Sequence, residues 1–216
     1  LEGEALDAAM ARMSPMSEQD AVTILLPIAA ALAAVHRKGL VHRDVKPENV
    51  HLAANAAGHV VPKLVDFGIA KDLSQPIAGS HHTVIGTPHF MSPEQARGQL
   101  GLDARTDQYS FAVMLYQLVT GVMPYDAESL LDLVRAIDAG AYVPPRELNA
   151  DISEEFQAVL GRAMARDAEN RFPNMTALAT ALLPFASDRL RASFAADFAD
   201  GTASDAEPQA VSDSLP

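Results

Sequence analysis

The sequence has no cysteine and no tryptophan among its 216 residues, and aromatic residues make up only 6% of it. Without cysteine, the chain cannot form a disulfide scaffold, a thiol nucleophile or a cysteine-ligated metal site. Basic residues are also scarce, because 16 lysines and arginines stand against 28 aspartates and glutamates, a formal net charge of −12. Nucleic acids and anionic membrane surfaces attract basic patches, so this balance argues against both as partners.

Long apolar runs and targeting signals are missing as well. The most apolar stretch, residues 21–35, is interrupted by Thr23 and Pro27, and it falls short of the roughly 18 to 20 residues that span a bilayer. Residues 1–7 carry three acidic side chains, whereas a signal peptide begins with basic ones. We therefore expect a cytoplasmic chain with no membrane segment.

Apolar residues nevertheless make up 49% of the chain, which is enough for the core of one domain. Two short apolar runs, 49–52 and 59–65, predict a small β-ribbon, and residues 72–93 predict a long irregular loop. Pro27 should kink or break the first helix. The fold class is therefore mainly α, a helical lobe with a short β-ribbon. Helical periodicity predicts helices over 17–39, 107–120, 129–139, 153–164 and 176–183.

The C-terminal residues differ from the rest of the chain. Residues 187–216 are rich in alanine, serine and acidic side chains and contain few large apolar groups. We expect a first domain over 1–186 and a disordered tail or linker over 187–216. Leu190, Phe194 and Phe198 could add one or two helical turns at its start.

Three motifs follow one another in the middle of the chain. Residues 42–49 read HRDVKPEN, residues 66–68 read DFG, and residues 86–97 read GTPHFMSPEQAR. In this order and spacing they resemble the catalytic half of a protein kinase, and in particular the bacterial serine/threonine kinases that are similar to eukaryotic ones. The resemblance covers residues 1–186 and implies the C-terminal lobe of that fold.

The resemblance implies roles in phosphoryl transfer for several of these residues. Asp44 would orient the attacking hydroxyl and accept its proton, and Lys46 would contact the transferred phosphate. Thr87 would hydrogen-bond both of them and help to select serine or threonine substrates. A lysine two residues after the aspartate is the serine/threonine pattern, so the expected partners are proteins phosphorylated on serine or threonine, including the chain itself by autophosphorylation.

The same resemblance implies ATP as cofactor, with Mg²⁺ and with Mn²⁺ as an alternative ion. Asn49 and Asp66 would hold the metal through hard oxygen ligands. Lys46, Glu48 and His51 would belong with them to the nucleotide site. His51 falls where the family has an aliphatic residue beneath the adenine, and it brings a polar, titratable group into an apolar slot.

Regulatory and structural roles follow by resemblance as well. Arg43 would pair with a phosphorylated residue of the activation loop, for which Ser80 and Thr83 are the candidates. Phe67 would pack against His42, Gly68 would let the backbone flip, and Asp107 would brace the backbone of the HRD motif. Glu94 would pair with Arg171. The structural set is therefore His42, Phe67, Gly68, Glu94, Asp107 and Arg171.

Part of the family pattern is absent from the sequence. No G-x-G-x-x-G loop and no V-A-I-K lysine precede Asp44, although the family uses both to hold the ATP phosphates. The sequence begins with Leu1, and residues 1–4 resemble the stretch just after the hinge between the two lobes. The sequence therefore predicts a fragment that is inactive alone, derived from an active kinase that could itself be anchored in a membrane.

Two other functions compete with a protein kinase. A pseudokinase would bind and regulate a partner protein, but it would not need Asp44, Lys46, Asn49 and Asp66 together. A small-molecule phosphotransferase of related fold would lack the Lys46-type residue and the peptide-docking segment 86–97. Both are present here, and they favour the protein kinase.

Overall fold

The computed structural model describes residues 3–54, 60–65 and 88–199, with side chains up to Phe194. Helices dominate this part of the chain, as the sequence predicts. In chain order the elements are β1 (Gly3–Ala5), α1 (Leu6–Met13), α2 (Glu18–His36), the 3₁₀ turn η1 (Pro47–Asn49), β2 (Val50–Ala54), β3 (Val60–Leu64), η2 (Pro88–Phe90), α3 (Pro93–Ala96), α4 (Arg105–Thr120), α5 (Leu130–Ala139), α6 (Pro145–Leu148), α7 (Glu154–Ala163), η3 (Ala168–Asn170), α8 (Met175–Leu182), η4 (Leu183–Phe185) and α9 (Asp188–Ala199).

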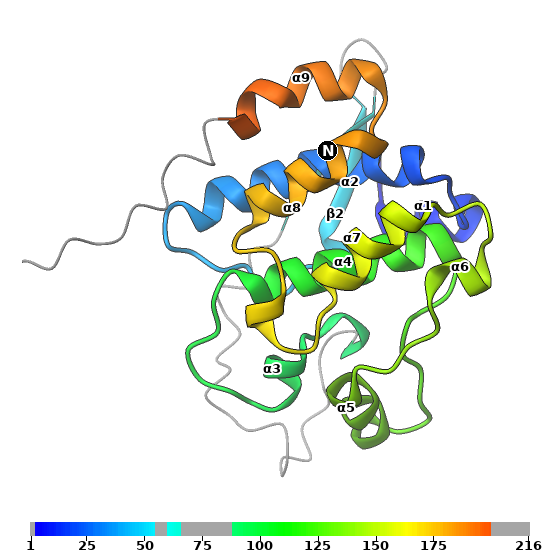
Figure 1. Ribbon diagram of the computed structural model, residues 1–216, viewed down its shortest axis with the longest axis vertical. Helices are drawn as coiled ribbons and strands as arrows, with labels where there is room; N and C mark the ends of the chain where they lie inside the picture. Colours follow the sequence, from blue (N-terminus) through cyan, green and yellow to red (C-terminus); the bar gives the residue numbers. More distant parts are fainter. Residues whose placement is uncertain (1–2, 55–59, 66–87, 200–216) are drawn as a thin grey trace, which may run out of the picture.

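Three helices form the centre of the core. α2 packs against both α4 and α8, and α4 also packs against α7 (Figure 1). α4 is buried along nearly its whole length, from Thr106 to Val119. Such a helix needs apolar side chains on all its faces, which explains why its apolar density is high. Gly121 ends α4 in the left-handed conformation at φ 77°, which glycine adopts without steric penalty.

α2 runs without interruption through Pro27, so of the predicted kink or break, the break is wrong. Its first turn is capped by Ser17, whose hydroxyl accepts a hydrogen bond from the Asp20 N–H at 3.1 Å. Leu25 and Ile28, on either side of the proline, are completely buried. Burying such a side chain stabilises by about 1.5 to 3 kcal/mol, so packing offsets the roughly 3 kcal/mol that an internal proline costs.

α2 is also longer than the apolar stretch in the sequence suggests. It is a 19-residue helix, long and apolar enough to span a membrane by length and composition alone. The prediction that no segment reaches that length was therefore wrong. Within the fold, 44% of its apolar window is buried, and Leu25, Leu26 and Leu32 have no exposed surface, as expected of a core helix.

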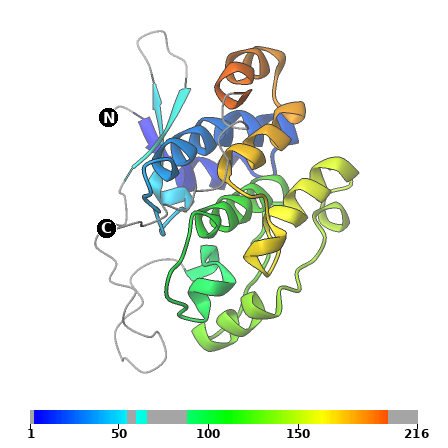
Figure 2. The same cartoon turned by 60° about the vertical axis from the view of Figure 1, so that its left-hand side comes forward.

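A small antiparallel sheet lies at one end of the helical body, beside α2 (Figure 2). The predicted ribbon is present as β2 and β3. In the part of the chain that the structure describes, β1 joins it as a third strand, with order β1-β2-β3. The sequence analysis missed this strand because three residues show no period. Gly3 is required there, since at its φ of 139° a Cβ atom would lie 2.1 Å from the Leu52 carbonyl oxygen.

Residues 188–199, which fall within the expected tail, form α9, and this helix includes the turns expected around Leu190, Phe194 and Phe198. This helix packs on α8 and η4. Leu190 and Phe194, one helical turn apart, are half-buried against the core. Two large apolar side chains on one face, docked onto an existing core, are enough to order a helix whose composition is otherwise that of a linker.

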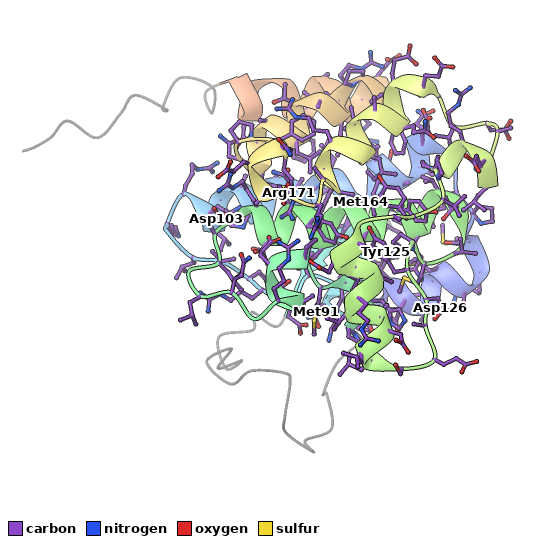
Figure 3. All side chains as sticks on the ribbon, turned by 60° about the horizontal axis from the view of Figure 1, so that its bottom comes forward. Met91, Asp103, Tyr125, Asp126, Met164 and Arg171 are labelled. Atoms are coloured by element: carbon purple, nitrogen blue, oxygen red, sulfur yellow. The ribbon has the colours of Figure 1, made fainter. Side chains whose placement is uncertain are left out.

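A buried ion pair joins two distant parts of the chain. Arg171, 2% exposed, donates to both carboxylate oxygens of Glu94 at 2.7 and 2.8 Å, and Thr106 donates to the same carboxylate at 3.0 Å. The remaining guanidinium donors bond the carbonyls of Ala165, Arg105 and Arg166. Arg171 lies inside the helical body, near the loop that carries Asp103 (Figure 3). Every charge of the pair is therefore compensated.

The environment of Glu94 shifts its pKa in two opposing ways. Burial by itself raises the pKa of this carboxyl, but hydrogen bonds from Arg171, the charge of Arg171 and the Thr106 hydroxyl together lower the pKa below its usual 4.5. A carboxyl with a lowered pKa contributes stability above its unfolded-state pKa and loses that contribution as the pH falls through its folded-state pKa.

Shortening Phe194 tests whether α9 is part of the folded domain. We expect Phe194→Ala to lower the free energy of unfolding by about 1 to 3 kcal/mol, less than for a fully buried phenylalanine, because only half of the ring is covered. Denaturant titration followed by circular dichroism measures the change. Arg189→Ala, on the exposed face of the same helix, is the matched control and should have no effect. Equal stability of both variants would mean that α9 does not dock.

Removing the charge of Glu94 tests the ion pair. Below about pH 4.5 the free energy of unfolding of the parent protein should fall more steeply with decreasing pH than that of Glu94→Gln, since the amide does not titrate. At pH 7, Arg171→Met leaves a buried carboxylate unpaired and should destabilise the fold by about 3 to 5 kcal/mol. Urea titrations at several pH values measure both effects. The exposed Glu147→Gln on α6 should leave the acid slope unchanged, and an identical slope for Glu94→Gln would refute the assignment.

Candidate active site

The HRD segment is a loop between α2 and the turn η1, and a buried carboxylate on α4 holds it in place. Asp107, which has no exposed surface, accepts hydrogen bonds from the backbone N–H of His42 and of Arg43, both at 2.7 Å. His36, at the end of α2, places its Nε2 2.8 Å from the same carboxylate. One side chain therefore joins two helices and the loop.

The backbone of Arg43 is in an unusual conformation. Its φ of 65° lies in the left-handed region, which costs a residue other than glycine about 1 kcal/mol or more. The bond from its N–H to Asp107 and the bond that its carbonyl accepts from Gln95 Nε2, at 3.0 Å, hold it there. The residue as a whole is exposed, although its backbone is fixed at both its N–H and its carbonyl.

Gln95 owes its position to the cap of the short helix α3. Ser92 and Gln95 form a reciprocal capping box, in which the Ser92 hydroxyl accepts from the Gln95 backbone N–H and the Gln95 side-chain oxygen Oε1 accepts from the Ser92 backbone N–H. The sequence analysis did not single out Gln95. The S-x-x-Q spacing at the start of a helix would have indicated its capping role, but nothing in the sequence indicates its bond to Arg43.

Three functional groups meet just after Arg43. The Asp44 carboxylate lies 3.2 Å from the Lys46 ammonium. Asn49 Nδ2 donates to the Asp44 carbonyl at 2.7 Å and to its carboxylate at 3.2 Å. Asn49 is 7% exposed, while the Asp44 and Lys46 side chains keep 21% and 13% of their surface. The arrangement thus leaves the Asp44 carboxylate partly exposed and holds one of its oxygens, Oδ2, through contacts with both Lys46 and Asn49.

His42 is part of the core beneath this loop. It is 1% exposed, and its Nδ1 accepts a hydrogen bond from the Asp44 N–H at 3.3 Å. Burial lowers the pKa of His42, against the opposing effects of the Asp107 charge and of a hydrogen bond with the backbone of Val65. An imidazole kept neutral by burial and used to hold the Asp44 backbone is a positioning group.

His51 lies in β2, between Ala5 of β1 and Lys63 of β3. The residue is half-buried, and its Nε2 is buried without a hydrogen-bond partner in the described part of the chain. Because most buried polar atoms are paired, this imidazole is in an environment more suited to an apolar side chain. Glu48, on the turn η1, is exposed and lines a cavity of about 380 Å³ together with residues of α1.

Several predicted site residues lie outside the described residues, namely Asp66, Phe67, Gly68, Ser80, Thr83 and Thr87. Val65, the residue just before Asp66, is held next to Asn49, because its backbone N–H donates to the Asn49 carbonyl at 2.9 Å. Within residues 3–54, 60–65 and 88–199, no three His, Asp or Glu side chains are close enough to hold a metal ion. With Nδ2 bonded to Asp44, Asn49 retains its amide oxygen, a hard ligand that suits Mg²⁺.

These groups define the chemistry that the site can perform. A fixed and accessible carboxylate can accept a proton from a hydroxyl. A neighbouring ammonium can contact an anionic group that is being transferred, and an amide oxygen can contribute to holding a hard cation. The arrangement therefore fits the attack of a hydroxyl on a phosphate.

Comparison with known proteins gives matches along most of the chain. A family model described as the protein kinase domain matches residues 1–183. The chain is 40% identical over 147 residues to a probable serine/threonine-protein kinase of Clostridium acetobutylicum, covering 68% of this chain and 22% of that protein. It is 38% identical over 178 residues to the serine/threonine-protein kinase PksC of Streptomyces coelicolor, covering 82% and 31%.

A third relative is named as a kinase of a different class. The chain is 41% identical over 154 residues to the tyrosine-protein kinase MasK of Myxococcus xanthus, covering 71% of this chain and 23% of that protein. In all three cases the chain spans a third or less of the relative's length. With the family match running over residues 1–183 and the geometry of the HRD loop, the conclusion is that the chain belongs to the protein kinase family.

Proposed function

We propose that this chain is the C-terminal lobe of a serine/threonine protein kinase, which transfers the γ-phosphate of ATP to serine or threonine residues of proteins. The observation that carries the proposal is the contact of Asp44 with both Lys46 and Asn49 in a loop braced by Asp107. A partner-binding scaffold has no need for a carboxylate fixed from two sides and accessible to solvent.

In the proposed reaction, the Asp44 carboxylate accepts the proton of the substrate hydroxyl as its oxygen bonds to the γ-phosphorus. The bond between that phosphorus and the bridging oxygen breaks, and ADP leaves with the electron pair. Lys46 contacts the transferred phosphoryl group and balances its charge. Asn49 and Asp66 would hold Mg²⁺, which when bound neutralises charge on the β- and γ-phosphates. Thr87 would orient Asp44 and Lys46.

Serine and threonine are the proposed acceptors for two reasons. Lys46 follows Asp44 by two residues, which is the serine/threonine pattern, and two of the three relatives described above are named as serine/threonine kinases. Since MasK is named as a tyrosine kinase, acceptor assays should include serine, threonine and tyrosine peptides.

Arg43, which is an exposed residue, supports a proposal for regulation. Its backbone is held at both its N–H and its carbonyl, so a phosphate bonded to the side chain would be tied to the loop that carries Asp44. Ser80 and Thr83 are the proposed phosphorylation sites, through autophosphorylation of the kinase in the cytoplasm.

The proposed lobe lacks the other half of an ATP site. Residues 1–43 contain no glycine-rich loop and no V-A-I-K lysine, and in kinases these hold the phosphates. Each electrostatic contact of this kind is worth a factor of about 100 to 1,000 in rate. We therefore expect negligible transfer by these 216 residues alone, and activity when a second lobe supplies those groups.

Replacing Asp44 by asparagine tests the proposed function. In a protein that contains both lobes, Asp44→Asn should reduce kcat by about 10²- to 10⁴-fold, because the amide cannot accept the proton. Transfer of labelled phosphate from ATP to a serine peptide measures the rate. Asp151→Asn, an equivalent change at an exposed site, should retain full activity. Unchanged activity of Asp44→Asn, or none in the parent, would favour a regulatory scaffold instead.

Replacing His51 tests its place beneath the adenine. His51→Leu should bind a non-hydrolysable ATP analogue about tenfold more tightly than the parent, since it removes a buried polar atom that lacks a partner. Calorimetric titration of the two-lobed protein measures the dissociation constants. His51→Gln keeps a polar group in the slot and should not gain affinity. If leucine brings no gain, His51 does not face the nucleotide.

A further inference from the structure

Gln95 carries a buried side-chain amide, 8% exposed, that has no role in the chemistry proposed above. Burying an amide costs free energy unless its polar atoms are hydrogen-bonded. Its Oε1 accepts from the Ser92 N–H at 3.0 Å, and its Nε2 donates to the Arg43 carbonyl at 3.0 Å. The amide therefore connects the start of α3 to the loop that carries Asp44.

The two bonds of this amide make opposite demands on the residue at position 95. Towards Ser92 the side chain must accept a hydrogen bond, and towards Arg43 it must donate one. A carboxylate only accepts, an ammonium only donates, and an aliphatic side chain does neither. A primary amide meets both demands at once, so the geometry calls for the chemistry of glutamine at this position.

The peptide unit that Gln95 holds is the one that joins Arg43 to Asp44. Asp107 accepts from the N–H groups of His42 and Arg43, so its bonds end one peptide unit earlier. In the described part of the chain, the Arg43 carbonyl accepts from Gln95, and the Asp44 N–H donates to His42 Nδ1 at 3.3 Å. Since the bond to the imidazole is long, Gln95 supplies the shorter of these two contacts.

This peptide unit sets the direction in which the Asp44 side chain leaves the backbone. Arg43, at a φ of 65°, holds a conformation that a residue other than glycine leaves unless its surroundings fix it. Rotation of the peptide plane would move the Asp44 carboxylate away from Lys46 and Asn49, each 3.2 Å from its Oδ2. Because a misplacement of about 1 Å can cost about 10²-fold in rate, the bond from Gln95 affects the proposed chemical step.

We propose that Gln95 is a positioning residue for phosphoryl transfer. Its amide fixes the peptide unit between Arg43 and Asp44, and through it the carboxylate that accepts the proton of the substrate hydroxyl. The inference rests on the proposed function. It also connects that carboxylate to segment 86–97, which the family resemblance assigns to docking of the substrate peptide.

The variant Gln95→Glu separates the two bonds, because glutamate can still accept from Ser92 in a capping box but cannot donate to Arg43. In a protein that contains both lobes, kcat should fall by about 10- to 100-fold, while the KM values for ATP and for a serine peptide change by less than about twofold. Transfer of labelled phosphate measures these constants. Gln99→Glu makes the same change at an exposed site four residues on and should retain full activity. An unchanged kcat for Gln95→Glu, or a loss confined to KM, would overturn the inference.

Amide hydrogen exchange in the 216-residue chain tests the contact without requiring phosphate transfer. In Gln95→Glu the Asp44 N–H should exchange at least about tenfold faster than in the parent, whereas amides in the middle of α4 should keep their rates. Thermal melting checks that this variant is folded. If it is not, Gln95→Met removes the donor without adding a charge and should give the same loss of kcat and the same faster exchange.

An unchanged exchange rate of the Asp44 N–H would show that Gln95 does not hold this peptide unit. Faster exchange combined with no transfer by the parent protein would count against the proposed function, and not against the contact between Gln95 and Arg43.

Discussion

Asp107 is the residue on which the arrangement of the candidate active site depends. Its carboxylate is fully buried and accepts from two consecutive backbone N–H groups of the loop and from the imidazole at the end of α2. A buried carboxylate is tolerated only where such bonds compensate its lost hydration. The loop stabilises the buried charge of Asp107, and Asp107 in turn holds the loop, because movement of the loop would leave that charge unsolvated inside the core. The position of Asp44 is thus fixed by the electrostatics of a residue that does not touch it.

A second buried network extends this constraint towards the surface that would bind substrate. Glu94 and Arg171 connect α3 to the segment before α8, and Gln95, next to Glu94, bonds the loop at Arg43. The backbone just before Asp44 is therefore held by hydrogen bonds from side chains of α3 and α4, which fix the position of the proposed chemical step.

The sequence was sufficient to predict the helices with a regular apolar period and the site residues that lie within one contiguous motif. Helices such as α5 and α7 show a clear apolar period and were predicted to within about two residues. The motif placed Asp44, Lys46 and Asn49 in one site, although their mutual contacts come from the structure. The failures have physical causes of a different kind. β1 is too short to show a period, and α9 and the unbroken α2 owe their order to packing against other elements.

The bonds between distant segments were the least predictable part of the site. Pairing of Glu94 with Arg171 was expected only from the family resemblance. The contribution of His36 to Asp107 and that of Gln95 to Arg43 had no signal in the sequence, since each depends on two segments meeting in space.

The capping box of α3 has a consequence beyond the helix that it begins. A helix of four residues has almost no stability of its own, so its hydrogen-bonded turn exists only while Ser92 and Gln95 remain in register. The same glutamine holds the carbonyl of Arg43, a residue under conformational strain. Unwinding this single turn would release that carbonyl and let Arg43 relax to an ordinary backbone conformation, so the strain in the loop and the folding of α3 are thermodynamically linked. The geometry around Asp44 is therefore coupled to a local helix–coil equilibrium that lies within the segment expected to contact the substrate.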